Sequence, residues 1–363
     1  MRVYQPVARC VDLFTPIVDA EHLHPNFKAV QIMQRAGEVA VVKDWADGFP
    51  DRDGKFVDQF QRTFNSCFWE VYLHGLFKDY GFEMDWAHPS PDFWLKTPLG
   101  EVIVEAVTAN EADGAEPEWG RKPIELIEKG DFWPLNRVAI IRLANALLSK
   151  VRKYERTYRA LPHVPRKPFV IAVAPFEQPF FNHQYDRPIQ ALLYDYYVDE
   201  QAYKANPSRY PNGPPGVKLG DIKKDNGAVI DLGLFLDDRW REVSAVIFSC
   251  TATWGKAVAM SSVARDGVIH SVWGQGEFGK PDKREKPIGV PSEGISDGLM
   301  VFHNHYATNP LSWDVFHRPG VIQVVFGPDG VQFEGRDQSL QFRVPTQWDR
   351  DEMADPGDEA MPS

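Results

Sequence analysis

The sequence predicts an α/β protein, and three observations carry the prediction. A helical apolar pattern over residues 56–80 is followed by three short strand-like segments, a second helical pattern and a continuous apolar run. Strand-like segments dominate the chain after residue 228. Hydrophobic residues make up 43% of the 363 residues, a share typical of globular proteins and sufficient for a sizeable core.

The first helix and the strands after it are predicted from spacing and turn residues. Apolar side chains recur over 56–80 at steps of three and four residues, and Gly81 follows as a helix terminator. Three strand-like segments come next, at 82–86, 92–96 and 102–108. Only Thr-Pro-Leu-Gly separates the last two, which indicates an antiparallel hairpin.

The second half of this unit is a long helix and a buried strand. The helix is predicted over 136–158, where apolar residues form one face, and two prolines follow it. The run Phe-Val-Ile-Ala-Val-Ala-Pro-Phe at 169–176 is typical of a strand covered on both faces. A further helix is predicted over 188–204.

Pro/Gly-rich stretches and shifts in pattern suggest five regions along the chain. They are an N-terminal extension (1–55), a core (56–204), a linker (205–227), a β-rich C-terminal portion (228–346) and an acidic tail (347–363) expected to be disordered. Strands in the C-terminal portion are predicted at 243–250, 258–262, 299–303, 321–326 and 331–334, with a Pro-Asp-Gly turn before the last.

Composition excludes several classes of protein. The formal charge is −11, from 40 Lys and Arg against 51 Asp and Glu, which argues against a uniformly basic nucleic-acid binder. No apolar run is long enough to span a membrane, and no signal peptide is evident. The three cysteines lie far apart, so neither a disulfide framework nor a cysteine zinc site is expected. A cytoplasmic location is therefore predicted.

Three carboxylates fall where the predicted elements converge. Asp92 opens the second strand and Glu105 lies in the third, so a hairpin would place them close together. Glu105 stands within Val-Ile-Val-Glu-Ala-Val, where a carboxylate is costly unless it is paired, hydrogen-bonded or bound to metal. Glu70 flanks the apolar stripe of the first helix. Such oxygen ligands suit Mg²⁺ or Mn²⁺.

The segments Pro91-Asp92 and Val104-Glu105-Ala106-Val107 resemble the motif of the PD-(D/E)xK nuclease superfamily. The resemblance covers about residues 56–200 and implies a restriction-endonuclease-like α-β-β-β-α-β core that hydrolyses phosphodiester bonds with Mg²⁺ or Mn²⁺. It makes Asp92 and Glu105 catalytic metal ligands and Glu70 an additional ligand.

The sequence departs from the family pattern at one position. Val107 stands where the family has its lysine, and an apolar side chain cannot orient water or offset charge. In some members of the superfamily this lysine lies on the following helix. Lys150 is the expected substitute here and the third catalytic residue, with Lys153 as the second choice.

Local charge favours a nucleic-acid substrate. Residues 137–167 contain nine Lys or Arg and one acidic residue, a local charge of +8. Phosphate contacts are predicted for Lys150, Arg152, Lys153 and Arg156. DNA is the first choice of partner and RNA the second, and the family resemblance allows a homodimer.

Two other interpretations stay open. The chain could be a catalytically inactive relative that acts as a binding or scaffolding module, with Glu105 in a salt bridge to Lys150 or Arg142 and Asp92 capping a turn. Alternatively, three histidines could form a transition-metal site in a metalloenzyme of another type. They are His303, His305 and His317.

Overall fold

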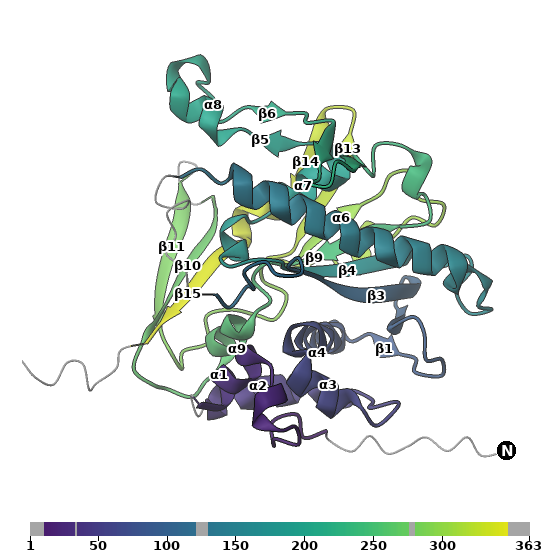
Figure 1. The fold of residues 1–363 in the computed structure, drawn as a ribbon, viewed down its shortest axis with the longest axis vertical. Coiled ribbons are helices and arrows are strands. Elements are labelled where there is room, and N and C mark those ends of the chain that lie inside the picture. Colours follow the sequence, from purple (N-terminus) through teal and green to yellow (C-terminus); the bar gives the residue numbers. More distant parts are fainter. Residues whose placement is uncertain (1–10, 33–34, 121–129, 276–279, 348–363) are drawn as a thin grey trace, which may run out of the picture.

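The centre of the protein is a mixed sheet of eight strands, which confirms the predicted α/β class (Figure 1). A computed structural model describes residues 11–32, 35–120, 130–275 and 280–347. The strands lie in the order β1-β2-β3-β4-β9-β12-β13-β14. Their bounds are Glu83–Met84 (β1), Phe93–Thr97 (β2), Gly100–Asn110 (β3), Phe169–Phe176 (β4), Ala245–Phe248 (β9), Met300–His303 (β12), Ile322–Gly327 (β13) and Gly330–Glu334 (β14).

The direction of the strands changes across the sheet. β1, β2 and β3 form an antiparallel meander, and β3, β4 and β9 run parallel. β12 is antiparallel to β9 and parallel to β13, and β13 and β14 form the predicted hairpin. All eight residues of β4 are buried, as expected for a strand covered on both faces.

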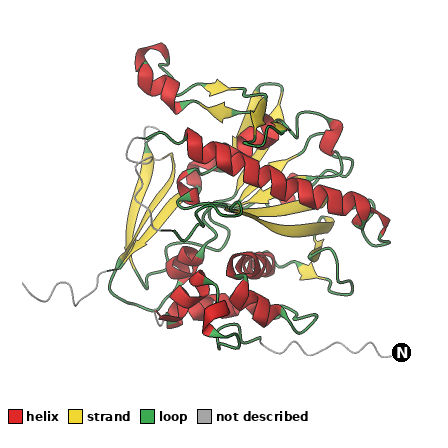
Figure 2. Ribbon diagram, in the orientation of Figure 1, coloured by secondary structure: helices red, strands yellow, loops and turns green. Residues whose placement is uncertain are grey.

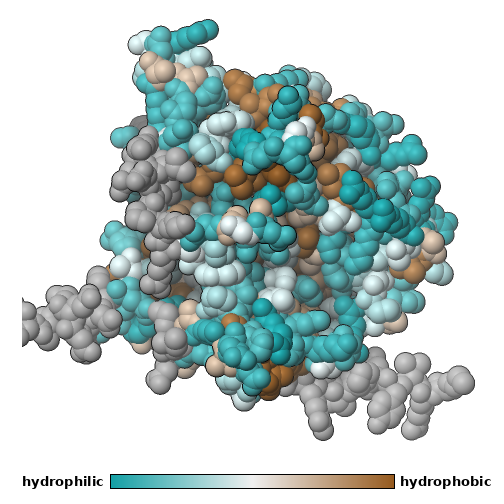
Figure 3. Space-filling model, in the orientation of Figure 1, coloured by the Kyte–Doolittle hydropathy of each residue, from teal (hydrophilic) through white to brown (hydrophobic). Residues whose placement is uncertain are grey.

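Helices cover both faces of the sheet (Figure 2). The long helix α6 and the shorter α7 lie on one face, and α1 to α4 with α9 lie on the other (Figure 1). Their bounds are Pro25–Ile32 (α1), Ala36–Ala46 (α2), Phe56–Arg62 (α3), Phe64–Asp79 (α4), Trp133–Arg156 (α6), Arg187–Tyr194 (α7) and Trp254–Met260 (α9). The face shown in Figure 3 is mostly hydrophilic.

The predicted regions do not fold as separate units. Residues 11–55 contribute α1 and α2, and Leu13, Phe27 and Trp45 are buried in the same apolar core as the central strands. The C-terminal portion contributes β9, β12, β13 and β14 to the sheet that begins with β1. It therefore completes the fold, because its strands cover an edge of β4 that would otherwise be exposed.

The expected linker at 205–227 contains paired strands. β6 (Gly216–Val217) pairs with β5 (Tyr197–Val198), and β7 (Asp221–Lys223) pairs with β8 (Val229–Asp231). The turn residues that suggested a linker thus lead into β6 or join β7 to β8. Of the acidic tail, only Gln347 lies within the described residues.

Three predicted elements differ from the structure. The helix expected over 56–80 is broken at Thr63, whose ψ of 51° is not helical. The helix expected over 188–204 is two helices, α7 and α8 (Glu200–Ala205), separated by β5. Of the strand expected over 258–262, residues 258–260 belong instead to α9, since a short apolar run does not by itself distinguish a strand from a helix.

A second sheet was not predicted as a unit. It has three strands in the order β11-β10-β15, with bounds Val268–Gln275 (β10), Pro281–Pro287 (β11) and Leu340–Thr346 (β15). β11 is mostly exposed and polar, so it carries no apolar alternation to mark it as a strand. Within the described ranges, no helix has both the length and the apolar character needed to cross a membrane.

Candidate functional site

The site begins where strands β2 and β3 separate. Their pairing extends as far as Phe93 and Val104, and β3 then continues paired with β4 on its other side. Asp92 lies at this point of separation, directly before β2. Its Oδ2 accepts a hydrogen bond from the backbone N–H of Ala106 at 2.8 Å. The carboxylate thus takes the place of the missing strand partner and is held beside Glu105.

Glu105 is fully buried and is held by three donors from one side. Its Oε1 accepts hydrogen bonds from Lys150 Nζ and Lys153 Nζ, both at 2.8 Å. Its Oε2 accepts from the Tyr158 hydroxyl at 2.9 Å. The two lysines are three residues apart on α6, so their ammonium groups share one helix face. Burial alone would raise the pKa of Glu105, but the two ammonium groups outweigh it and lower the pKa.

The structure therefore brings Lys150 into contact with Glu105. Its side chain is 19% exposed, against 44% for Lys153, so Lys150 is the more enclosed of the two cations. Val107, two residues after Glu105, is half-buried and has no polar group to contribute. The predicted salt bridge between Glu105 and Lys150 is also present. The catalytic and structural interpretations of this pair hence share the same geometry.

Glu70 approaches the other carboxylates from α4, which lies across the sheet from α6 (Figure 1). Burial and the nearby Asp92 carboxylate raise the pKa of Glu70 to about 8. Burial and the Glu105 carboxylate raise the pKa of Asp92 to about 6. These shifts show that the three carboxylates are electrostatic neighbours. We call Glu70, Asp92 and Glu105 the carboxylate cluster.

The exposed end of α6 presents cations beside the carboxylate cluster. Arg152, Lys153 and Arg156, for which phosphate contacts were predicted, are exposed. In the part of the chain that the structure describes, Arg152 and Arg156 form no ion pair. Their charges are therefore available to a polyanion. We call these two residues with Lys153 the basic end of α6.

Aromatic rings stack next to the loop that carries Asp92. His88 and His163 lie parallel with ring centroids 3.8 Å apart, and both stack on Trp94. His163 Nε2 is 2.8 Å from the carbonyl oxygen of Ser90, two residues before Asp92. The stack therefore braces this loop. Trp94, in β2, is half-buried rather than fully enclosed in the core.

Tyr158 was not among the site residues predicted from the sequence. Tyr154, four residues before it, packs on Phe169 with ring centroids 4.5 Å apart. Tyr158 reaches Glu105 instead, from a 3-10 turn just after α6. The spacing of eight residues from Lys150 is the one signal that could have indicated it, because α-helical positions i and i+8 lie on one face.

The histidine metal site proposed from the sequence is wrong. His303 Nε2 pairs with the Gln323 side chain at 2.7 Å, whereas His317 pairs with Glu334 at 2.9 Å. His305 lies against the ring of Tyr306. The three imidazoles have separate partners, because β12 ends at His303 and the chain turns away after it.

The carboxylate cluster is not arranged as a complete metal site in the structure. Among the described residues, no three His, Cys, Asp or Glu side chains converge as metal ligands. Both oxygens of Glu105 are occupied by donors, whereas Glu70 makes no hydrogen bond within the described ranges. Ligation by Glu105 would require at least one oxygen to exchange its present donor for the cation.

Comparison with known proteins adds no family assignment. Neither the protein-family models, nor the curated proteins, nor the solved structures include a match to this chain.

Proposed function

We propose that this chain is a metal-dependent nuclease that hydrolyses phosphodiester bonds in DNA. The observation that carries the proposal is the convergence of Asp92, Glu105 and Lys150 at the separation of β2 and β3. RNA is the second choice of substrate, and a homodimer is a further expectation from the family resemblance.

The element order supports a restriction-endonuclease-like core. A helix (α4), an antiparallel meander (β1, β2 and β3), a second helix (α6) and a parallel strand (β4) follow one another. This is the α-β-β-β-α-β order expected from the resemblance. The carboxylates lie on β3, before β2 and on the first helix of that order.

The donor chemistry of the carboxylate cluster fits Mg²⁺ or Mn²⁺. Glu70, Asp92 and Glu105 offer hard oxygen ligands from three different elements, and a divalent cation would relieve the repulsion between them. These three residues would hold the ion. When bound, such an ion lowers the pKa of water and offsets negative charge on the phosphate.

The other residues have separate roles in the proposed reaction. Lys150 fixes the orientation of Glu105 and places a cation where charge develops on the scissile phosphate. Tyr158 and Lys153 hold the same carboxylate from neighbouring directions. Arg152 and Arg156 contact the phosphates on either side of the scissile phosphate, and these contacts do not depend on base sequence.

A second candidate function rests on the hydrogen bonds that occupy the Glu105 carboxylate. Both of its oxygens are satisfied by protein donors, and Val107 replaces the motif lysine. A nuclease-like protein that binds nucleic acid through the basic end of α6 without hydrolysis would have this arrangement. It needs neither a metal nor a free carboxylate oxygen.

The deciding experiment measures cleavage of plasmid DNA, single-stranded DNA and RNA with Mg²⁺ or Mn²⁺. The wild type should cleave, whereas Asp92→Asn and Glu105→Gln should match the metal-free background. Glu101→Gln is the matched control, because Glu101 lies on the same strand, is 41% exposed and pairs with Lys167. Cleavage by both site variants at the wild-type rate would refute the assignment. Binding without cleavage under all conditions would favour the second function.

A further inference from the structure

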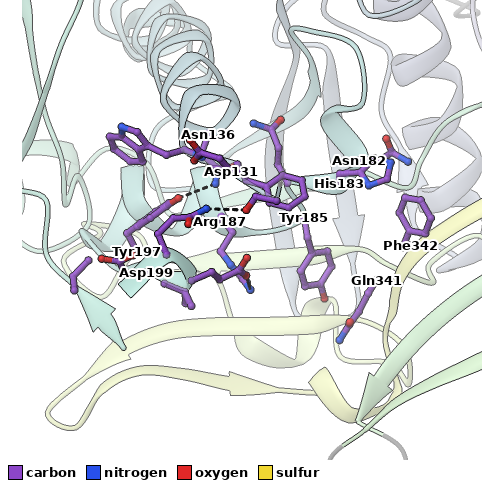
Figure 4. Close-up of a pocket in the computed structure, with 18 of the residues that line it drawn as sticks. Asp131, Asn136, Asn182, His183, Tyr185, Arg187, Tyr197, Asp199, Gln341 and Phe342 are labelled. Atoms are coloured by element: carbon purple, nitrogen blue, oxygen red, sulfur yellow. Dashed lines mark hydrogen bonds and ion pairs between the residues drawn. The ribbon is translucent and has the colours of Figure 1, made fainter. Parts of the chain in front are cut away.

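A cavity of about 760 Å³ lies at the start of α6 (Figure 4). The carboxylate cluster contacts α6 near its other end, through Lys150 and Lys153. It is bounded by the start of α6, by residues 182–187, by the β5–α8 segment and by β15. Lys150 follows Trp133, which lines the cavity, by 17 helical positions, a separation of about 25 Å along the helix. The cavity is therefore separate from the proposed hydrolytic site.

Two amide side chains that line the cavity have unsatisfied hydrogen-bonding groups. Gln184 is 3% exposed, and neither its Oε1 nor its Nε2 has a partner. Asn136 is 2% exposed; its Nδ2 donates to the Tyr197 hydroxyl at 3.0 Å, but its Oδ1 has no partner. Buried polar groups are normally paired, so unpaired groups in two residues that line a cavity favour a ligand with complementary donors and acceptors.

The walls around these amides are rich in aromatic rings. Trp133 and Tyr197 lie edge to face with centroids 5.2 Å apart, and Phe342 lines the wall formed by β15 (Figure 4). Tyr185 adopts a φ of 51°, a left-handed conformation uncommon for a residue other than glycine. Backbone strain of this kind concentrates at binding sites, where it positions a side chain. The cavity thus combines flat apolar surfaces with polar groups.

The charges around the cavity disfavour an anionic group as its main ligand. Arg187, one of the lining residues, is already paired with Asp186 at 3.0 Å and with Glu200 at 2.9 Å. Asp131 and Asp199 add negative charge to the lining. Burial lowers the pKa of His183, which disfavours the charged form of its ring. A neutral, planar and polar ligand fits this environment better than a phosphate.

We propose that this cavity binds a nucleobase. The faces of a base would stack on the aromatic walls, and its edge would pair with the amides of Gln184 and Asn136. The base could come from a free nucleoside or from a strand of nucleic acid with an unstacked nucleotide. The proposal does not depend on phosphodiester hydrolysis, because the cavity and the carboxylate cluster use different residues.

The test is calorimetric titration of the full-length protein with adenosine, guanosine, cytidine, uridine and thymidine, and with short single-stranded oligonucleotides. Ribose 5-phosphate serves as the ligand without a base. Gln184→Met removes the unpaired amide at similar volume, and Gln332→Met is the matched control on the exposed edge strand β14. Thermal melting of each variant is measured in parallel.

We expect at least one nucleoside or oligonucleotide to bind and ribose 5-phosphate not to bind. Gln184→Met should weaken that binding by about tenfold or more without lowering the melting temperature, because it removes a group that the folded protein leaves unpaired. If nucleosides bind, the ligand is a free nucleoside. If Gln184→Met weakens the binding of oligonucleotides alone, the base belongs to a nucleic-acid strand. No binding of any base-containing ligand, or binding unchanged by Gln184→Met, overturns the proposal. Asp92→Asn should leave nucleoside binding unchanged, which separates this site from the proposed nuclease activity.

Discussion

Lys150 Nζ lies 2.8 Å from Glu105 Oε1, although the two residues are 45 positions apart in the chain. The strand supplies a buried carboxylate and the next helix supplies the cation that the strand itself lacks at Val107. The geometry depends on the docking of α6 onto β3 and β4, so any change that shifts the helix also shifts the proposed catalytic lysine.

The first prediction compares the two lysines that hold Glu105. Lys150→Met should lower the free energy of unfolding at pH 7 by about 1–3 kcal/mol, because a buried carboxylate loses its more enclosed partner. Lys153→Met should cost less than about 1 kcal/mol, since Lys153 is more exposed. Urea denaturation of both variants measures the difference. A larger loss for Lys153→Met would contradict the proposed ranking.

The second prediction uses the raised pKa of Glu70. Burial and Asp92 raise this pKa to about 8, so the folded protein retains a proton that the unfolded chain releases near its ordinary pKa. The folded protein therefore loses stability as pH rises from about 5 to above 8, because the buried Glu70 carboxyl must then ionise. In EDTA, Glu70→Gln should melt at a higher temperature than the wild type, by an increment that grows across this pH range. The increment should reach about 2–6 °C.

With divalent metal, the wild type should melt at a higher temperature than Glu70→Gln, which reverses the order expected in EDTA. Mn²⁺ binds the ionised carboxylates and stabilises the folded wild type by mass action, whereas Glu70→Gln loses a ligand. Thermal melting at pH 8 with and without Mn²⁺ checks this. A melting temperature that Mn²⁺ leaves unchanged in the wild type would argue against a metal role for Glu70.

Local patterns were sufficient to predict the elements that form the candidate site. The buried strand 169–176, the β2–β3 hairpin and the long helix all follow from apolar spacing and turn residues within one segment. Glu105 stood out because it interrupts an apolar run. Lys150 was indicated by the family resemblance, because some members of that superfamily carry on the next helix the lysine that is missing at Val107.

Long-range pairing could not be predicted in the same way. β9 pairs with β4 although the expected linker separates them in the sequence. The local pattern of a strand does not indicate which other strand it pairs with. Tyr158 contacts a residue 53 positions away, and it does so from a 3-10 turn where the sequence predicts the last residue of the helix. The orientation of such a side chain depends on how α6 ends, which is the least predictable feature of a helix.

The third prediction concerns the hydroxyl of Tyr158. Tyr158→Phe removes the donor to Glu105 Oε2 and leaves a buried carboxylate oxygen without a partner. The unfolding free energy should fall by about 1–2 kcal/mol in EDTA. The loss should be smaller in Mn²⁺ if that oxygen is the one that ligates metal. Urea denaturation under both conditions gives the comparison, and equal losses would place the ligand oxygen elsewhere.

The fourth prediction tests the basic end of α6 as a phosphate-binding surface. Arg152 and Arg156 are exposed and unpaired within the described ranges, so each should neutralise about one phosphate. Arg152→Ala and Arg156→Ala should each reduce the slope of log K against log salt by about 0.7 to 0.9, equally for DNA of different sequences. Fluorescence anisotropy at several salt concentrations measures the slope. Lys286→Ala is the control, because Lys286 is an exposed cation on β11 in the separate three-stranded sheet. A salt slope unchanged by both arginine variants, or reduced as much by Lys286→Ala, would place the nucleic-acid contact on another surface.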